Sequence, residues 1–363
     1  MKRFSINPPT SERGILFVDH ESAGRSGHLG HALVETQPGH VLAFFANCSD
    51  VSRGHNGDGW MEFKRSTDGG RTWSASQPLE YSKQAYADDP TRTVMCERAV
   101  RCPAGVVLLF TLECGNAEAG RHFWTPVYVP RVLRSEDGGE TWGEPRELGR
   151  ERARVFDTLV AADEVLVLKL DNDSEKQWYG HLPEHRYTLW VSRDAGQSFE
   201  PRSNLPLDLV MHGYGALALL PDGALVAYIY DQRDEFQLVT FVSHDMGRSW
   251  GAPFSTRFSK RIRNPKMTPF AAGYVMHGRS GSMGNSPDLG HLVLYTSDDG
   301  LHWDEGRFVE MRNSDTVIYS GAYSNSLLVH GPQGRGPSRL LIQSSHAYRA
   351  CMTNIHHHYL ELE

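Results

Sequence analysis

The sequence predicts an all-β protein, a six-bladed β-propeller made of four-stranded antiparallel sheets. Two repeats lead to this fold class: a short turn frame that occurs five times in the 363 residues, and a pattern of short apolar strands between its copies. No linker or low-complexity segment interrupts the chain. We therefore expect one domain over residues 1–363.

The turn frame reads Ser, any residue, Asp, any residue, Gly, any two residues, Trp. The Asp carboxylate is expected to accept backbone N–H groups, while the Gly supplies the positive φ of a tight turn. The Ser hydroxyl can bond the same turn, and the Trp ring is expected to be largely buried in a seam between units. The frames are 66–73, 135–142, 192–199 (with Phe199 for Trp), 243–250 and 296–303 (with Thr296 for Ser), and we assign a structural role to their aspartates Asp68, Asp137, Asp194, Asp245 and Asp298.

Between the frames, each unit has an apolar strand, a Gly turn, a second apolar strand, a polar loop and a third strand, as in antiparallel sheets. The sixth unit has no frame and reaches Glu363, so we expect the segment at about 3–20 to complete its sheet and close the ring. The first two strands of the six units are expected at 31–39 and 40–47, 97–105 and 106–113, 156–164 and 165–172, 214–223 and 224–232, 265–273 and 274–281, and 323–334 and 339–349.

Composition excludes several classes of protein. Hydrophobic residues make up 39% and charged residues 22%, as in globular proteins, and no apolar run is long enough to cross a membrane. The formal net charge of −7 and the lack of a Lys/Arg run argue against nucleic-acid binding. The five cysteines, an odd number, and the start of the chain, which has no signal-peptide pattern, lead us to expect free thiols and a cytoplasmic protein, or a secreted one if a signal segment has been removed. We expect no cofactor.

Candidate site residues follow from the expected architecture. First strands line the axis of a propeller, and we expect ligands at the end where first strands begin and second strands finish. Polar residues gather at these positions although the strands around them are apolar, which suits a sugar, or else a water-filled channel. They are His28, His31, Glu97, Arg98, Asp157, His212, Tyr214, Lys266 and Tyr323 in first strands, and Asn47, Glu113, Asp171, Asp231, Arg233, Arg279, His346 and Arg349 at second-strand ends, with Asp58 in a polar loop.

The frame is the Asp-box, and its repetition resembles the sialidase-like (neuraminidase-like) β-propellers. The resemblance implies an exo-acting glycoside hydrolase that releases a terminal acidic sugar. Its Tyr nucleophile corresponds to Tyr323, because Gly321-Ala322-Tyr323-Ser324 resembles the segment that carries it, and Asp58 corresponds to the acid/base.

The resemblance also implies three arginines that hold a substrate carboxylate. Arg279 lies near the expected fifth-blade position, whereas Arg25 and Arg233 are only the nearest arginines to the other two. The expected Glu partner of the nucleophile is replaced by His212-Gly213-Tyr214. We expect His31, Arg98 and Tyr214 to bind substrate beside these arginines.

Histidine chemistry is the main alternative. His212 or His31 could act as general acid or base near neutral pH, as in a polysaccharide lyase or an atypical glycosidase acting on a uronate-containing glycan. We expect no metal site, because no short HxH or HExxH element lies at the start of a first strand. We assign a structural role to His356-His357-His358 in the last strand, where alternation sends neighbours to opposite faces. A third possibility is a non-catalytic carbohydrate-binding propeller.

Overall fold

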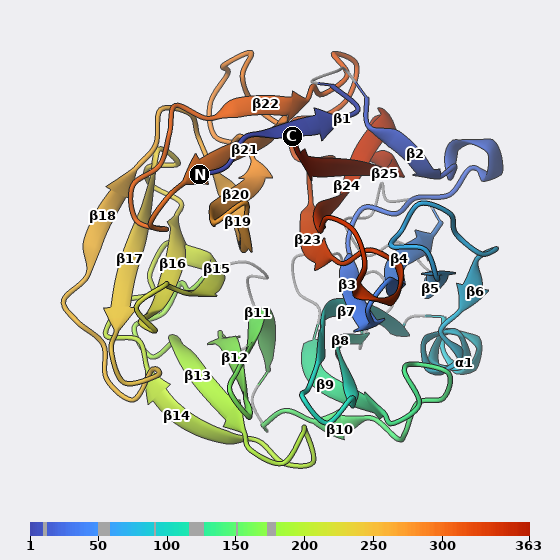
Figure 1. Ribbon diagram of the computed structural model, residues 1–363, viewed down its shortest axis with the longest axis horizontal. Helices are drawn as coiled ribbons and strands as arrows, with labels where there is room; N and C mark the ends of the chain where they lie inside the picture. The colour runs from blue at the N-terminus through green and yellow to red at the C-terminus, as the bar shows by residue number, and fades with distance from the viewer. Residues whose placement is uncertain (10–12, 50–58, 91, 116–126, 150–151, 173–178) are drawn as a thin grey trace.

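The computed structural model describes residues 1–9, 13–49, 59–90, 92–115, 127–149, 152–172 and 179–363. Six antiparallel sheets stand around a central axis, as Figure 1 shows, which confirms the predicted fold class. Five sheets have four strands, and the sixth has five. No helix within the described ranges is long and apolar enough to span a bilayer.

In each of the first three blades, the strands follow one another from the axis outward, so each strand pairs with the next in sequence. The blades are β3 (Ala32–Gln37), β4 (His40–Cys48), β5 (Gly59–Ser66) and β6 (Gln77–Pro78); β7 (Arg92–Arg101), β8 (Val107–Gly115), β9 (Val127–Ser135) and β10 (Arg146–Glu147); and β11 (Ala153–Ala161), β12 (Glu164–Asp171), β13 (Arg186–Ser192) and β14 (Glu200–Asn204).

The remaining blades repeat this order, and the last one takes strands from both ends of the chain. They are β15 (His212–Leu219), β16 (Leu225–Asp231), β17 (Gln237–Ser243) and β18 (Phe254–Arg257); β19 (Arg263–Phe270), β20 (Gly273–Arg279), β21 (Leu292–Ser297) and β22 (Arg307–Glu310); and β23 (Ser324–Val329), β24 (Arg339–Arg349) and β25 (Met352–Leu362) with β1 (Phe4–Asn7) and β2 (Ile15–Val18). The short helices are η1 (Glu21–Ala23), α1 (Glu80–Asp88) and η2 (Pro332–Gly334).

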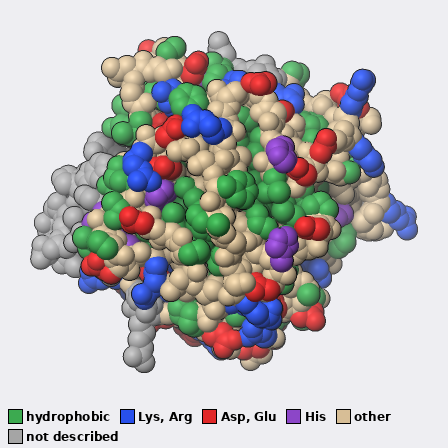
Figure 2. Space-filling view, turned by 90° about the vertical axis from the view of Figure 1, so that its left-hand side faces the viewer, with side chains coloured by type: hydrophobic (Ala, Val, Ile, Leu, Met, Phe, Trp, Pro, Cys, Tyr) green, Lys and Arg blue, Asp and Glu red, His purple; other side chains and the backbone are tan. Residues whose placement is uncertain are grey.

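The N-terminal segment closes the ring as expected. Strand β1 pairs antiparallel with β25, with Phe4 opposite Leu362, and β2 pairs with the same strand, with Ile15 opposite His357. Both chain ends therefore lie beside one another in Figure 1. On the side of the molecule that Figure 2 shows, acidic and basic side chains are interspersed over the outer strands, without a patch of one sign.

The predicted turn chemistry is present in the first four frames. In the first, Ser66 Oγ donates to Asp68 at 2.8 Å and accepts the Gly70 N–H at 2.8 Å, while Asp68 accepts the Thr72 N–H at 2.9 Å. The second to fourth frames repeat these bonds. Gly139 has a φ of 88°, and a Cβ there would lie 2.4 Å from Leu42 of the preceding blade, so only glycine fits.

The fifth frame uses different residues from those predicted. Ser297 Oγ donates to Asp299 at 3.1 Å and accepts the Gly300 N–H at 2.8 Å, and Asp299 accepts the His302 N–H. Asp298, which we had assigned to the turn, instead contacts the N-terminal amine. In this frame the Asp and the Gly are adjacent, whereas one residue separates them in the other four. The prediction chose the wrong Asp because two neighbouring aspartates, Asp298 and Asp299, both fit the pattern.

The aromatic residue that ends each frame packs across a seam onto the preceding blade. Trp142 lies edge-on to Phe44 with ring centroids 6.1 Å apart, and Trp250 Nε1 donates to Ser203 Oγ at 3.0 Å. Trp73, Trp142 and Trp250 are partly buried and pack against the hydrophobic core, as the prediction of largely buried rings requires, although none of them is fully buried. The other seam contacts are Trp73 on Phe17, Phe199 on Phe110 and Trp303 on Tyr228.

We predict that Trp142→Ala lowers the free energy of unfolding by about 1–3 kcal/mol, less than the roughly 3–5 kcal/mol of a fully buried Trp, since Trp142 is only partly buried. Urea denaturation of the wild type and the variant measures this difference. Equal stabilities would show that the ring does not hold the seam between the first two blades.

Candidate active site

The first strands of four consecutive blades each carry a β-bulge. The pairing register shifts between Cys96 and Arg98, between Val155 and Asp157, between Gly213 and Gly215, and between Arg263 and Lys266. A bulge adds a residue to one strand and re-aims its side chain. The residues within the four shifts include Glu97, Phe156, Tyr214 and Asn264, and all four line the same pocket on the axis.

All six blades contribute to this axial pocket. Its volume of ≈ 40 Å³ holds one or two water molecules. Besides the four bulge residues, its polar and cationic lining consists of His31 just before β3, Arg98 of β7, Arg154 of β11, Lys266 of β19, and Tyr323 and Ser324 at the start of β23.

The backbone is strained around the pocket. Tyr214, Asn264 and Ala322 have φ values of 28°, 56° and 59°, in the left-handed region that side chains other than glycine rarely adopt. Such strain persists where surrounding contacts enforce it, and it concentrates at functional sites. Of the strained residues, Ala322 precedes Tyr323 in the chain, and Tyr214 and Asn264 line the pocket together with Tyr323.

The charges around the pocket act on the hydroxyl of Tyr323. Its hydroxyl bonds the Tyr214 hydroxyl at 3.0 Å, and the guanidinium of Arg279 lies 4.3 Å from its ring centroid. Burial by itself would raise the pKa of Tyr323, but the positive charges of Arg279 and Arg263 outweigh it and lower this pKa below its usual value. Burial raises the pKa of Tyr214, so Tyr214 stays protonated and donates to Tyr323.

Arg279 and Arg263 lie behind the two tyrosines. Arg279 is fully buried and its Nε donates to the Gly321 carbonyl at 2.8 Å. Its two terminal nitrogens have no well-formed hydrogen bond within the described part of the chain. Arg263 lies 5.3 Å from the ring centroid of Tyr214 and 3.9 Å from Glu235.

Cationic side chains outnumber carboxylates around the pocket. Three of the cations are paired, Arg154 with Glu97 at 3.1 Å, Arg98 with Asp157 at 3.2 Å and Arg263 with Glu235 at 3.9 Å. The ammonium of Lys266 donates to the Phe156 carbonyl at 2.7 Å. Counting Arg263 and Arg279, five cations meet three carboxylates, the third being Glu235, so the pocket has a positive potential in a chain whose net charge is −7.

The structure brings together most of the residues predicted on the axis. His31, Arg98, Tyr214 and Tyr323 line the pocket, and Arg279 stacks on Tyr323. His31 is buried, and burial lowers its pKa to about 3, so its imidazole is neutral at pH 7.

Other predicted residues lie elsewhere, or outside the described residues. His212 is not among the lining residues: its Nδ1 faces the Asp208 carbonyl at 2.8 Å and its Nε2 faces the Arg233 guanidinium at 2.8 Å. Arg25 bonds Asn47 at the end of β4, and it does not line the pocket either. Asp58 lies outside the described residues.

The sequence did not reveal two of the arginines, Arg154 and Arg263. Each lies three residues before a position that we had predicted, Asp157 and Lys266, because the strands begin earlier than their apolar runs. These two strands share one pattern: an Arg lies three residues before a charged residue, and that charged residue starts an apolar run.

Family models match two parts of the chain. Residues 158–349 match the model of the BNR repeat-like domain, and residues 64–75 match that of the BNR/Asp-box repeat. No curated protein sequence matches the chain.

Solved structures of similar fold span nearly all of this chain. A protein of unknown function from Dyadobacter fermentans DSM 18053 has a TM-score of 0.72 and 14% identity, covering 99% of this chain and 100% of that one. The Hadza microbial sialidase Hz136 has a TM-score of 0.68 and 14% identity, covering 96% and 68%. An α-L-arabinanase from Penicillium chrysogenum, complexed with arabinobiose, has a TM-score of 0.62 and 15% identity, covering 98% and 99%. At these identities the likeness shows a shared fold.

We predict that Tyr323 releases its proton at a lower pH than an ordinary tyrosine, whose pKa is about 10. The near-ultraviolet phenolate absorbance should therefore rise below that pH in the wild type. The early rise should be missing in Tyr323→Phe and present in Tyr295→Phe, which removes a buried hydroxyl far from the pocket lining. Identical titrations of the wild type and Tyr323→Phe would contradict the charge arrangement described above.

Proposed function

Since the chain belongs to the BNR repeat-like family, we propose that its axial pocket is the active site of an exo-acting glycoside hydrolase that releases a terminal acidic sugar. The observation that carries this proposal is Tyr323, a buried phenol whose pKa two neighbouring arginines lower. Such a group is a competent nucleophile. The occurrence of a sialidase and an arabinanase among proteins of this fold supports a glycosidase.

The charge of the pocket supports an acidic substrate. A volume of ≈ 40 Å³ is too small for a sugar ring but large enough for a carboxylate group, which would meet the cationic lining. The lining includes the guanidinium groups of Arg98 and Arg154, and guanidinium–carboxylate hydrogen bonds are among the stronger ones in proteins. In this proposal the sugar ring stays at the mouth of the pocket with its acid group inside.

In the proposed reaction, the Tyr323 phenolate attacks the anomeric carbon while the bond to the leaving oxygen breaks. The proton that Tyr323 has lost goes to solvent, and the positive charges of Arg279 and Arg263 stabilise its anion. The leaving oxygen takes a proton from an acid, for which Asp58 is the candidate from the sequence. Water then cleaves the tyrosyl glycoside and gives a proton back to the conjugate base of that acid, which releases the sugar with retained configuration and restores the phenolate.

Histidine chemistry has less support. Arg233 and the Asp208 carbonyl occupy both ring nitrogens of His212, which does not line the pocket. His31 does line it, but with a pKa of about 3 it is not the acid that a lyase or atypical glycosidase would need near pH 7.

Fluorogenic aryl glycosides of sialic acid, a uronic acid and arabinose provide the test. We predict turnover of an acidic glycoside, and a decrease in kcat/KM of at least about 100-fold in Tyr323→Phe. Unfolding free energy should fall by only about 1 kcal/mol, the value of one hydrogen bond.

The matched control is Tyr295→Phe. Tyr295 is also fully buried, and its hydroxyl donates to the Lys260 carbonyl at 2.7 Å, so this variant loses one hydrogen bond away from the pocket. It should keep its turnover. Near wild-type activity of Tyr323→Phe would refute the mechanism, turnover of only the arabinoside would refute the acidic substrate, and binding without turnover of any glycoside would indicate a carbohydrate-binding propeller.

A further inference from the structure

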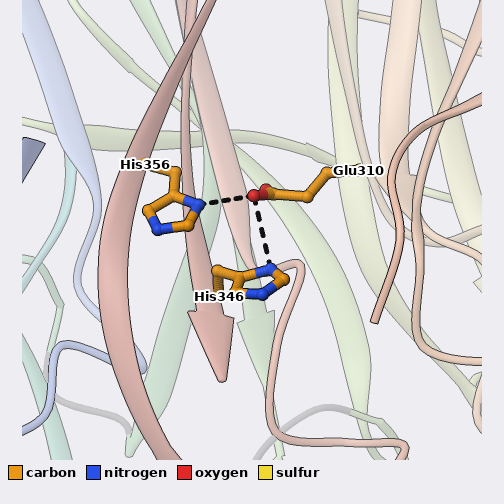
Figure 3. Close-up of side chains that lie close together, drawn as sticks. All are labelled: Glu310, His346 and His356. Carbon is orange, nitrogen blue, oxygen red and sulfur yellow. Dashed lines mark hydrogen bonds and ion pairs between the residues drawn. The ribbon is translucent and has the colours of Figure 1, made fainter. Parts of the chain in front are cut away.

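A cluster of one carboxylate and three imidazoles lies at the seam between the fifth and sixth blades. Glu310 ends β22, His346 lies in β24, and His356 and His358 lie in β25. All four side chains are buried. As Figure 3 shows, His356 and His346 both point toward Glu310, with Nδ1 to Oε1 distances of 2.5 and 3.3 Å.

Strand alternation selects the members of this cluster. His356 and His358 face Glu310, whereas His357 between them faces the other side of the sheet. There His357 stacks on Phe17 with centroids 3.8 Å apart and contacts Gln343. The His-His-His run therefore supplies two imidazoles to the cluster and one to the packing of β2.

Five polar groups surround the carboxylate of Glu310. Oε1 accepts the N–H of Gly14 at 2.7 Å and bonds His356 Nδ1, and His346 Nδ1 lies 3.3 Å from the same oxygen, so three groups converge on Oε1. Oε2 is already bonded by His358 Nε2 and Ser344 Oγ, each at 3.1 Å. A cation between Oε1 and the two Nδ1 atoms would satisfy all three by coordination.

We propose that Glu310, His346 and His356 bind one divalent transition-metal ion of the zinc class, through Oε1 and the two Nδ1 atoms. These three atoms lie within 4.8 Å of one another, and the ligands of a tetrahedral zinc ion lie about 3.4 Å apart. One carboxylate oxygen and two imidazoles suit zinc or cobalt(II).

The outer contacts of the carboxylate fit the ligand set. His358 and Ser344 would orient the carboxylate through Oε2, as outer hydrogen bonds do at metal sites.

The position of the site implies a structural role. It joins the last strand of the fifth blade, two strands of the sixth, and the N-terminal segment at Gly14. A Cβ at Gly14 would lie 2.6 Å from His358 Nε2, so the N-terminal segment approaches the cluster closely. Next to His346, Ser345 bonds the backbone of Ala322 and Tyr323 at 2.7 and 2.9 Å, so a bound ion would also steady the strand behind the axial pocket.

The full-length protein, freed of metal by dialysis against a chelator, is titrated with zinc and with cobalt(II). We expect one equivalent per chain, visible absorption from cobalt(II), and a Tm that rises with zinc. X-ray absorption of the zinc-loaded protein should show two imidazole ligands. A protein that takes up neither ion, or whose zinc has no imidazole ligand, would overturn the proposal and leave the cluster as a metal-free network.

His346→Gln and His356→Gln should each abolish stoichiometric zinc binding and the cobalt(II) absorption. His357→Gln is the matched control, because it removes an equally buried imidazole from the same strand but from the opposite face. It should retain both signals. Wild-type zinc affinity in both His346→Gln and His356→Gln would overturn the site, and if these variants fail to fold, the imidazole count from the wild type decides.

Discussion

Closure of the ring is the constraint on which the rest of the structure depends. The last blade borrows β1 and β2 from the N-terminus, and without them β25 would end the sheet as an unpaired edge. Because each blade packs on its neighbours, only a closed ring brings all six first strands to one axis. The axial pocket takes residues from all six blades, so it exists only in the closed ring, and the same closure brings Gly14 of the N-terminal segment to Glu310.

The axial pocket is lined by polar side chains, although the repeated strands around it are mostly apolar. Regular first strands would alternate their side chains along the axis, whereas a bulge adds a residue that interrupts this alternation. Four blades have such a bulge at the pocket, and Glu97, Tyr214 and Asn264 are the polar groups that lie at three of them. The resulting strain at Tyr214 is compatible with stability because the surrounding sheets enforce the conformation.

Local chemistry explains what the sequence could predict. The turn frames indicated the fold because their Ser, Asp and Gly bond one another within five residues, and only the adjacent Asp298 and Asp299 misled the register. His212 was misplaced because period-two alternation puts it on the same face as Tyr214, and the bulge at Tyr214 breaks that alternation. The convergence of Arg263 and Arg279 on Tyr323, and of three histidines on Glu310, depends on long-range packing that no local pattern encodes.

The central claim is that Tyr323 forms a covalent bond with an acidic sugar. Incubation with an activated, fluorinated sugar acid, which slows the hydrolysis of a glycosyl-enzyme, followed by mass spectrometry of the intact protein and its peptides, tests this directly. We expect one adduct per chain on the peptide that contains Tyr323, and none in Tyr323→Phe. An adduct on another residue, or turnover of the acidic substrate without any adduct, would contradict it.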